Sequence, residues 1–196
     1  MAKPHLEIER RWLLKKLPDY EIRQAPNSTY IHYTSVYIYF YENLETRIQR
    51  RVNHRGPYPQ WHPDIKPEIT YPVVTKIGKG LSRLESPKLL ADESLFRFYF
   101  DQKEFPRVSV DLWEIPFPQR KGKKWEIKQP NWVTNPVELG FDQYNNIVFV
   151  ELEFDDVDKA KAFSDFPDWM EIEKEVTDDP RYNVRSLAVD GIPNPR

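Results

Sequence analysis

The strongest constraint on the fold is a two-residue alternation of charged and apolar side chains that recurs along the chain. It is clearest near the N-terminus, where Glu7, Glu9 and Arg11 are interleaved with Ile8 and Trp12. Successive side chains of a β-strand point to opposite faces of a sheet, so this spacing predicts a strand with two acids and a base on one face. A merely solvated face of a half-buried strand shows the same pattern, and one stretch alone does not separate the two interpretations.

The same alternation returns in later stretches. Glu151 and Glu153 share one face of a predicted strand, while Val150, Leu152 and Phe154 share the other. We expect strands over residues 6–14, 30–41, 45–52, 69–77, 81–85, 95–100, 107–113 and 147–154. We expect short helices over 86–95, 156–166 and 169–176, a proline-rich loop over 53–70 and a polar insertion over 122–140.

Strands of this kind fit two architectures. An open antiparallel sheet would expose its charged faces to water, whereas a closed barrel would enclose them in a wet interior. The strand period does not choose between these alternatives. Opposite charges that recur on the same face favour the barrel.

Composition narrows the class of protein. The 196 residues suit one large domain or two small ones with a substantial core, and the 39% hydrophobic share is that of a folded protein. A formal net charge of −2 gives no support to broad nucleic-acid binding, which relies on excess positive charge. The chain has no cysteine and no apolar run long enough to span a bilayer. With no stretch that resembles a signal peptide, we expect a cytoplasmic protein without a membrane partner.

Several stretches, taken in chain order, resemble the CYTH superfamily, also called triphosphate tunnel metalloenzymes. The opening pair Glu7 and Glu9 resembles the family signature of two glutamates and a lysine at alternate positions, with Arg11 in the place of the lysine. Further resemblances cover residues 21–24, 47–49, 75–76, 81–85, 110–112, 150–154, 166–169, 175–177, 181–182 and 186–188.

The resemblance implies an α+β fold, mostly antiparallel β, in which residues 1–196 form one domain: an eight-stranded β-barrel tunnel with peripheral helices. Members of the family bind a triphosphate with a divalent metal inside the tunnel, and most hydrolyse it. Carboxylate oxygens suit hard cations, so we expect Mg²⁺ or Mn²⁺. The implied metal ligands are Glu7, Glu9, Asp111, Glu151 and Glu153.

The triphosphate itself carries dense negative charge and needs several cationic contacts. The implied phosphate ligands are Arg11, Arg47, Lys76, Arg83 and Arg97. Of the whole set, Glu7, Glu9, Arg11 and Lys76 are the implied catalytic residues. The expected reaction is hydrolysis of inorganic tripolyphosphate or of a nucleoside triphosphate by a water that the cation activates.

The sequence also departs from the family pattern. Gln49 stands in the place of a second arginine, Pro87 in the place of a glutamate and Leu95 in the place of a lysine. Each lost charge-assisted contact weakens binding by about 1.5–3 kcal/mol. These departures keep two alternatives open: a module that binds a phosphorylated ligand with weakened catalysis, and an adenylate-cyclase-type activity.

Overall fold

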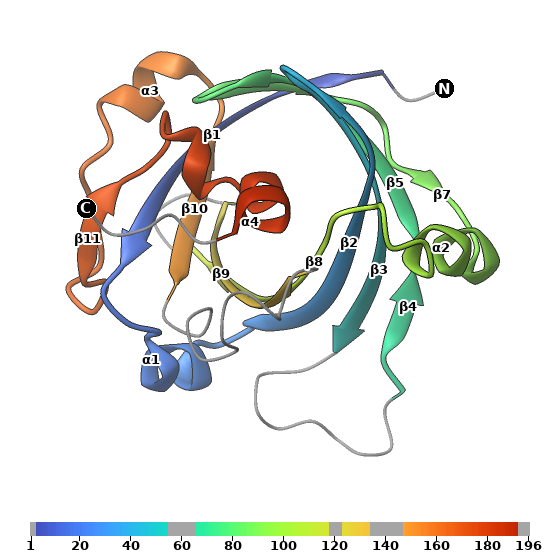
Figure 1. The fold of residues 1–196 in the computed structure, drawn as a ribbon. Coiled ribbons are helices and arrows are strands. Elements are labelled where there is room, and N and C mark those ends of the chain that lie inside the picture. The colour runs from blue at the N-terminus through green and yellow to red at the C-terminus, as the bar shows by residue number, and fades with distance from the viewer. Residues whose placement is uncertain (1–2, 55–65, 118–122, 134–146, 192–196) are drawn as a thin grey trace.

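A closed β-barrel forms the centre of the computed structural model, which describes residues 3–54, 66–117, 123–133 and 147–191. Within these residues, eight antiparallel strands pair around the ring in the order β3-β2-β8-β9-β10-β1-β6-β5, and β5 pairs back onto β3 (Figure 1). The strands are β1 (His5–Leu14), β2 (Thr29–Tyr41), β3 (Leu44–His54), β5 (Pro72–Lys79), β6 (Ser82–Glu85), β8 (Arg107–Pro116), β9 (Lys124–Val133) and β10 (Val148–Phe154). The predicted eight-stranded tunnel is therefore confirmed.

Three short strands extend the ring. β4 (Glu68–Thr70) pairs with β3, β7 (Leu89–Leu90) with β5, and β11 (Ile172–Glu175) with β1. The helix predicted over 86–95 is wrong at residues 89–90, which form β7. The helix predicted over 169–176 is wrong at residues 172–175, which form β11. The predicted loop over 53–70 ends in β4, and its residues 55–65 lie outside the described residues.

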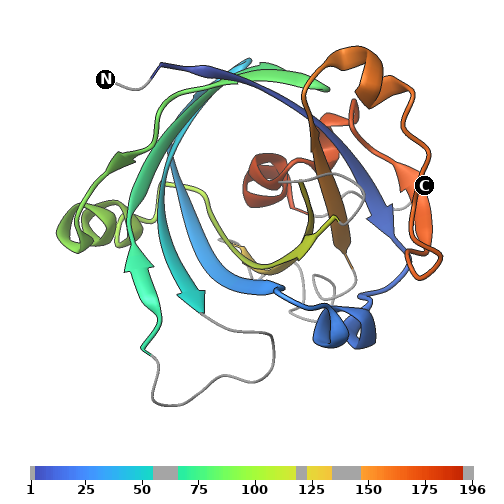
Figure 2. The ribbon, with the colours of Figure 1, turned by 180° about the vertical axis from the view of Figure 1, so that it is seen from behind.

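Of the α-helices in the described residues, three lie outside the barrel and one lies within it. The outer ones are α1 (Asp19–Gln24), α2 (Glu93–Phe100) and α3 (Val157–Lys161). A 3₁₀ turn, η2 (Pro180–Tyr182), leads into α4 (Val184–Asp190), which lies inside the ring in both views (Figures 1 and 2). Val184 and Ala188 of α4 pack against inward side chains of β2 and β8, including Tyr33, Val110 and Leu112. Among the described residues, no helix has the length and apolarity that crossing a membrane requires.

The strand register decides which face of the wall is apolar. Trp12 of β1 and Trp125 of β9 point outward and meet edge to face, with ring centroids 6.5 Å apart. Phe163 and Phe166, which follow α3, cover both tryptophans from outside. Because this core takes the even residues of β1 and the odd residues of β9, the intervening charged residues must face the lumen.

Two predicted elements change type. Residues 95–100 belong to α2 rather than to a strand, because Asp92 caps the helix by accepting a hydrogen bond from the Leu95 amide at 2.9 Å. Phe96 and Phe100 then stack four residues apart with centroids 5.5 Å from each other. The polar insertion predicted over 122–140 contains the wall strand β9, while its residues 122 and 134–140 lie outside the described residues.

Candidate functional site

Charged side chains line the lumen from one end of the barrel to the other. Along β1, His5 and Glu7 face a cavity of about 480 Å³ at one end of the tunnel. Glu9 and Arg11 face a second cavity, of about 200 Å³, which lies beside α4. Lys76 of β5 borders both cavities. We call them the far cavity and the α4 cavity.

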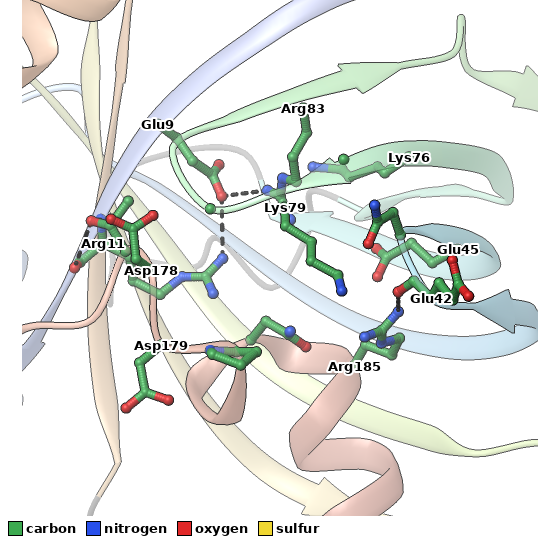
Figure 3. Close-up of a pocket in the computed structure, with 16 residues that line it drawn as sticks. Glu9, Arg11, Glu42, Glu45, Lys76, Lys79, Arg83, Asp178, Asp179 and Arg185 are labelled. Atoms are coloured by element: carbon green, nitrogen blue, oxygen red, sulfur yellow. Dashed lines mark hydrogen bonds and ion pairs between the residues drawn. The ribbon is translucent and has the colours of Figure 1, made fainter.

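The α4 cavity is bounded by two strand turns and by the segment that leads into α4. Glu9 lies between Arg11 and Arg83, and Arg185 of α4 reaches across to donate to the Glu42 carbonyl at 3.3 Å (Figure 3). No aromatic side chain is among the described residues that line it. The cavity therefore suits a small charged ligand better than an aromatic base.

Glu7 joins the first strand to the opposite side of the ring. Its carboxylate accepts from the Lys76 ammonium at 2.7 and 2.8 Å and from Arg83 at 3.0 Å. Lys76 also contacts Glu85 of β6 at 2.9 Å. Burial would raise the pKa of Glu85, but the charge of Lys76 more than offsets it and holds that pKa below its usual range.

Arg11 links two acids of the predicted set. Its guanidinium donates to Glu151 at 2.5 Å, to Glu9 at 3.2 Å and to the Tyr182 carbonyl at 3.1 Å. Burial would lower the pKa of Arg11, but Glu151 and Glu9 raise it above its ordinary value. Burial would likewise raise the pKa of Glu151, yet the charges of Arg11 and Lys128 hold it far below its ordinary value. Both groups are therefore charged at neutral pH.

Strand β9 supplies lumen charges that the sequence analysis missed. Lys128 binds Glu151 and also Glu126, the latter at 2.9 Å, while Lys124 binds Glu114 of β8 and Glu126. Burial would raise the pKa of Glu126, but Lys128 and Lys124 lower it to about 2. The signal was present in the sequence as Lys124, Glu126 and Lys128 at alternate positions. The proline-bearing, polar character of residues 122–140 instead favours the interpretation as an insertion.

Two guanidinium groups offer unused donors to the lumen. Arg47 pairs with Glu45 at 3.3 Å, and the Nε atoms of Arg47 and Arg83 have no hydrogen-bond partner among the described residues. Both arginines line an inner extension of the α4 cavity. The other charged residues that line this extension are Arg11, Glu45, Lys76, Lys128, Glu151 and Arg185. Six cations and two carboxylates are among its described lining residues, so the extension concentrates cationic groups that could contact an anion.

Glu153 differs from the other lumen acids. It borders the far cavity and a smaller one that is also lined by Glu9, Lys123, Lys124, Glu126 and Glu151. Its carboxylate has no ion pair or hydrogen bond within the described part of the chain, while its backbone lies in the ladder between β1 and β10. Burial, followed by the negative charges of Glu126, Glu7 and Glu9, raises the pKa of Glu153. Carboxylates therefore crowd one another around this position.

Asp111 is not with the other predicted metal ligands, which corrects the sequence analysis. Its carboxylate accepts hydrogen bonds from Tyr30 at 2.6 Å, from His32 at 2.9 Å and from Asn131 at 2.8 Å, on the outer face of the wall. The neighbouring even residues of β8 face inward because the apolar side of α4 packs against them. The helix inside the barrel thus inverts the expected polarity of this strand.

Arg97 is also outside the tunnel, which corrects a second predicted position. Its side chain lies on α2, is 69% exposed and pairs with Glu93 one helical turn away at 2.7 Å. The remaining predicted residues all line the tunnel cavities: Glu7, Glu9, Arg11, Arg47, Lys76, Arg83, Glu151 and Glu153.

The three residues that depart from the family pattern can also be located in the structure. Gln49 lies in the lumen wall and donates to the Ser35 hydroxyl at 2.8 Å. Pro87 borders the far cavity, while Leu95 lies on α2 and is 42% exposed. A lysine at position 95 would therefore not reach the lumen, so the leucine removes no lumen contact here.

Within the described residues, no three acids or histidines are gathered as ligands of one metal ion. Glu7, Glu9 and Glu151 each contact two cationic side chains instead. The described geometry is that of a charged, internally compensated tunnel.

Comparisons with known proteins agree with this architecture. No protein-family model matches the sequence, and no curated protein matches it. The chain is similar to a solved structure described as the inorganic triphosphatase NE1496, with a TM-score of 0.55, 20% identity and 99% of both chains covered. A second structure, described as the hypothetical protein NE1496, has a TM-score of 0.54 at 21% identity, covering 95% of this chain and 99% of that one. The fold is thus CYTH-like, as the sequence motifs predicted.

Proposed function

We propose that the tunnel binds a triphosphate and hydrolyses it. The observation that carries the proposal is the inner extension of the α4 cavity, where six cations converge and two buried arginine Nε–H groups lack partners among the described residues. A buried donor without a partner is costly, and a phosphate oxygen would satisfy it. A solved structure that shares the fold is named an inorganic triphosphatase, which supports the same reaction.

The roles of the chain's own residues follow from their positions. Arg47, Lys76 and Arg83 would bind the phosphate oxygens from β3, β5 and β6, with Arg11 on β1 beside them. α4 borders the same space through Asn183, Val184 and Arg185 and would limit the access of bulk water. Because no aromatic side chain is among the described residues that line the α4 cavity, through which the extension is reached, we favour inorganic tripolyphosphate over a nucleoside triphosphate.

The proposal includes a divalent cation, Mg²⁺ or Mn²⁺. The donor chemistry fits, because Glu153 is a carboxylate whose pKa is raised by burial and then by neighbouring acids, and a cation would relieve the repulsion among these acids. Glu7, Glu9 and Glu151 would join it once their ion pairs open. A cation held there would neutralise negative charge that develops on the phosphates.

A second candidate function is capture of a phosphorylated ligand without turnover. It is favoured by the positions of the acids, because no three acids or histidines of the described residues are close enough together to bind one metal ion.

Phosphate release separates the two functions. We would measure it from tripolyphosphate and from ATP with Mg²⁺ or Mn²⁺, using the native chain and a Glu7→Gln/Glu9→Gln variant. The proposal predicts metal-dependent release from tripolyphosphate that the double substitution abolishes. Binding of tripolyphosphate without any release would favour the second function, and equal release by both proteins would exclude a role for the first strand.

A further inference from the structure

A row of apolar side chains crosses the outer wall of the barrel. Five neighbouring strands contribute one residue each, and each residue lies directly opposite the next in the strand pairing. Their chain neighbours Lys76, Arg83 and Glu7 line the tunnel cavities, so the row itself points outward. We call it the outer row, and its members, in order across the wall, are Tyr41, Leu44, Ile77, Leu84 and Leu6.

The described helices leave this part of the wall uncovered. α3 and the residues that follow it pack on β1 from Ile8 onward, and α2 packs on β2 and β3 around Val36 and Ile48. These two helices lie on opposite sides of the ring (Figure 1). Four of the five side chains of the outer row are consequently 41–66% exposed.

The surface beside the outer row is uncharged. The next outward positions on the side away from the α4 cavity are those of Tyr39, Thr46, Thr75 and Ser86. The hydroxyls of Thr46 and Thr75 lie 3.0 Å apart and bond to each other. On the other side Lys79 follows Ile77 by two residues, but its side chain extends into the α4 cavity (Figure 3).

The size of this surface is that of an interface. Together with Tyr39, the outer row exposes on the order of 600 Å² of mostly apolar surface, which is at the upper end of what a monomer leaves uncovered. Each partner of a stable complex buries about 800 Å². The adjoining hydroxyl residues extend the surface towards that area.

The chemistry of the surface limits which partner fits it. Each of the five strands is paired on both sides, so an added strand has no free edge there and a partner must pack face to face. Anionic membranes attract clusters of lysine and arginine, and the residues that adjoin the outer row include no such cluster. A second copy of the same apolar surface matches it, and a net charge of −2 causes little repulsion between copies.

We infer that the outer row is the contact surface of a homodimer whose two-fold axis passes near Ile77. Ile77 is the middle residue of the row, so a two-fold rotation at this point places it against the partner's Ile77. The same rotation places Leu44 against the partner's Leu84. The inference goes beyond the proposed function and does not depend on it, because the outer row lies outside the tunnel.

Analytical ultracentrifugation of the native chain from about 1 to 100 µM measures the dissociation constant of the dimer. We expect dimers over most of this range. Ile77→Asp should raise the dissociation constant about a hundredfold or more, because it places a carboxylate against an apolar surface. Residue 77 is 50% exposed in the single chain, so water can solvate the new charge in the monomer. Circular dichroism checks the fold, and if Ile77→Asp is not folded, Leu84→Lys replaces it with the same expected loss.

Leu90→Asp is the matched control. Leu90 is 78% exposed and lies in β7 beside α2, where Asp92 and Glu93 interrupt the apolar surface. This variant should dimerise as the native chain does.

A mixture of Ile77→Asp and Ile77→Lys tests the symmetry. If residue 77 faces its own copy, the opposite charges meet across the axis. The mixture should then form a heterodimer about tenfold tighter than the dimer of either variant alone.

Several results would overturn the inference. One is a native chain that remains monomeric up to about 100 µM. Another is a dimer that a folded Ile77→Asp variant leaves intact or that Leu90→Asp dissociates. A mixture without a heterodimer would contradict the axis at Ile77. A monomeric native chain that floats with phosphatidylcholine vesicles would assign the outer row to a lipid surface instead of a second copy.

Discussion

Arg11 on β1 and Glu151 on β10 lie directly opposite each other in the antiparallel pair, and the arginine Nε donates to the carboxylate at 2.5 Å within the lumen. The same carboxylate binds Lys128 of β9, so one acid compensates two cations and links three neighbouring strands. The charged side chains inside the tunnel therefore help to stabilise the barrel, and they also form the proposed binding site.

Removal of the Glu151 charge should destabilise the fold. Breaking a buried pair from one side leaves an uncompensated charge, which costs about 3–5 kcal/mol. We predict a loss of this size for Glu151→Gln in urea unfolding. Glu175→Gln removes a partner of Arg10 whose side chain is 40% exposed, and should cost no more than about 1 kcal/mol. Equal losses in the two variants would contradict the structural role of the lumen pair.

Much of the barrel was predictable, because most wall strands alternate apolar and charged residues along their length. The period of two was enough to place β1, β3, β8 and β10, and the density of aromatic and β-branched residues over 30–41 placed β2. The same pattern put Glu7, Glu9 and Arg11 on one face, where the structure has them.

The missed features have a common physical cause in tertiary contacts. Alternation predicts that the two faces of a strand differ, but it does not predict which face points inward. In β8 the apolar face points inward because Val184 and Ala188 of α4 pack against it. Asp111 is thereby turned outward. The apolar residues of 95–100 fit both the two-residue period of a strand and the spacing of a helix. The Asp92 cap favours the helix, and Arg97 therefore lies on α2.

Stability should fall in acid as Glu126 is protonated. The folded-state pKa of Glu126 is about 2, below the ordinary value of 4.5, so the stabilisation is fully present above pH 4.5 and is lost as pH falls toward 2. Its full size is on the order of 3 kcal/mol. Urea unfolding of the native chain and of Glu126→Gln should therefore differ at pH 7 and converge near pH 2. A difference that does not change with pH would contradict this origin.

Asp111→Asn should affect stability and leave the tunnel chemistry intact. The carboxylate accepts three hydrogen bonds outside the lumen, and these bonds hold its pKa below the ordinary value despite burial. Weakening them should cost about 1–3 kcal/mol in thermal or urea unfolding. Phosphate release from tripolyphosphate and its dependence on Mg²⁺ concentration should stay within twofold of native. A large rise in the Mg²⁺ requirement would show that Asp111 is a metal ligand after all.

Arg83 and Arg97 should differ in their effect on ligand affinity. Arg83 lines the α4 cavity with a buried guanidinium, whereas Arg97 lies exposed on α2. Loss of a charge-assisted contact of about 1.5–3 kcal/mol predicts binding roughly tenfold to over a hundredfold weaker for Arg83→Gln in Mg²⁺. Arg97→Gln should bind imidotriphosphate, an analogue whose nitrogen bridges resist hydrolysis, as the native chain does. Calorimetry on both variants measures this, and similar losses in the two would mean that the ligand binds elsewhere.

The most direct test of the triphosphate site is a crystal structure of the native chain with imidotriphosphate and Mn²⁺, with data collected for the anomalous signal of manganese. We predict density for the phosphate chain between Arg47, Lys76 and Arg83 beneath α4, and a manganese peak beside Glu153 with Glu9 or Glu151 turned toward it. Phosphate density only on the outer wall, or an empty lumen at saturating ligand, would contradict the proposal that this tunnel is a triphosphate site.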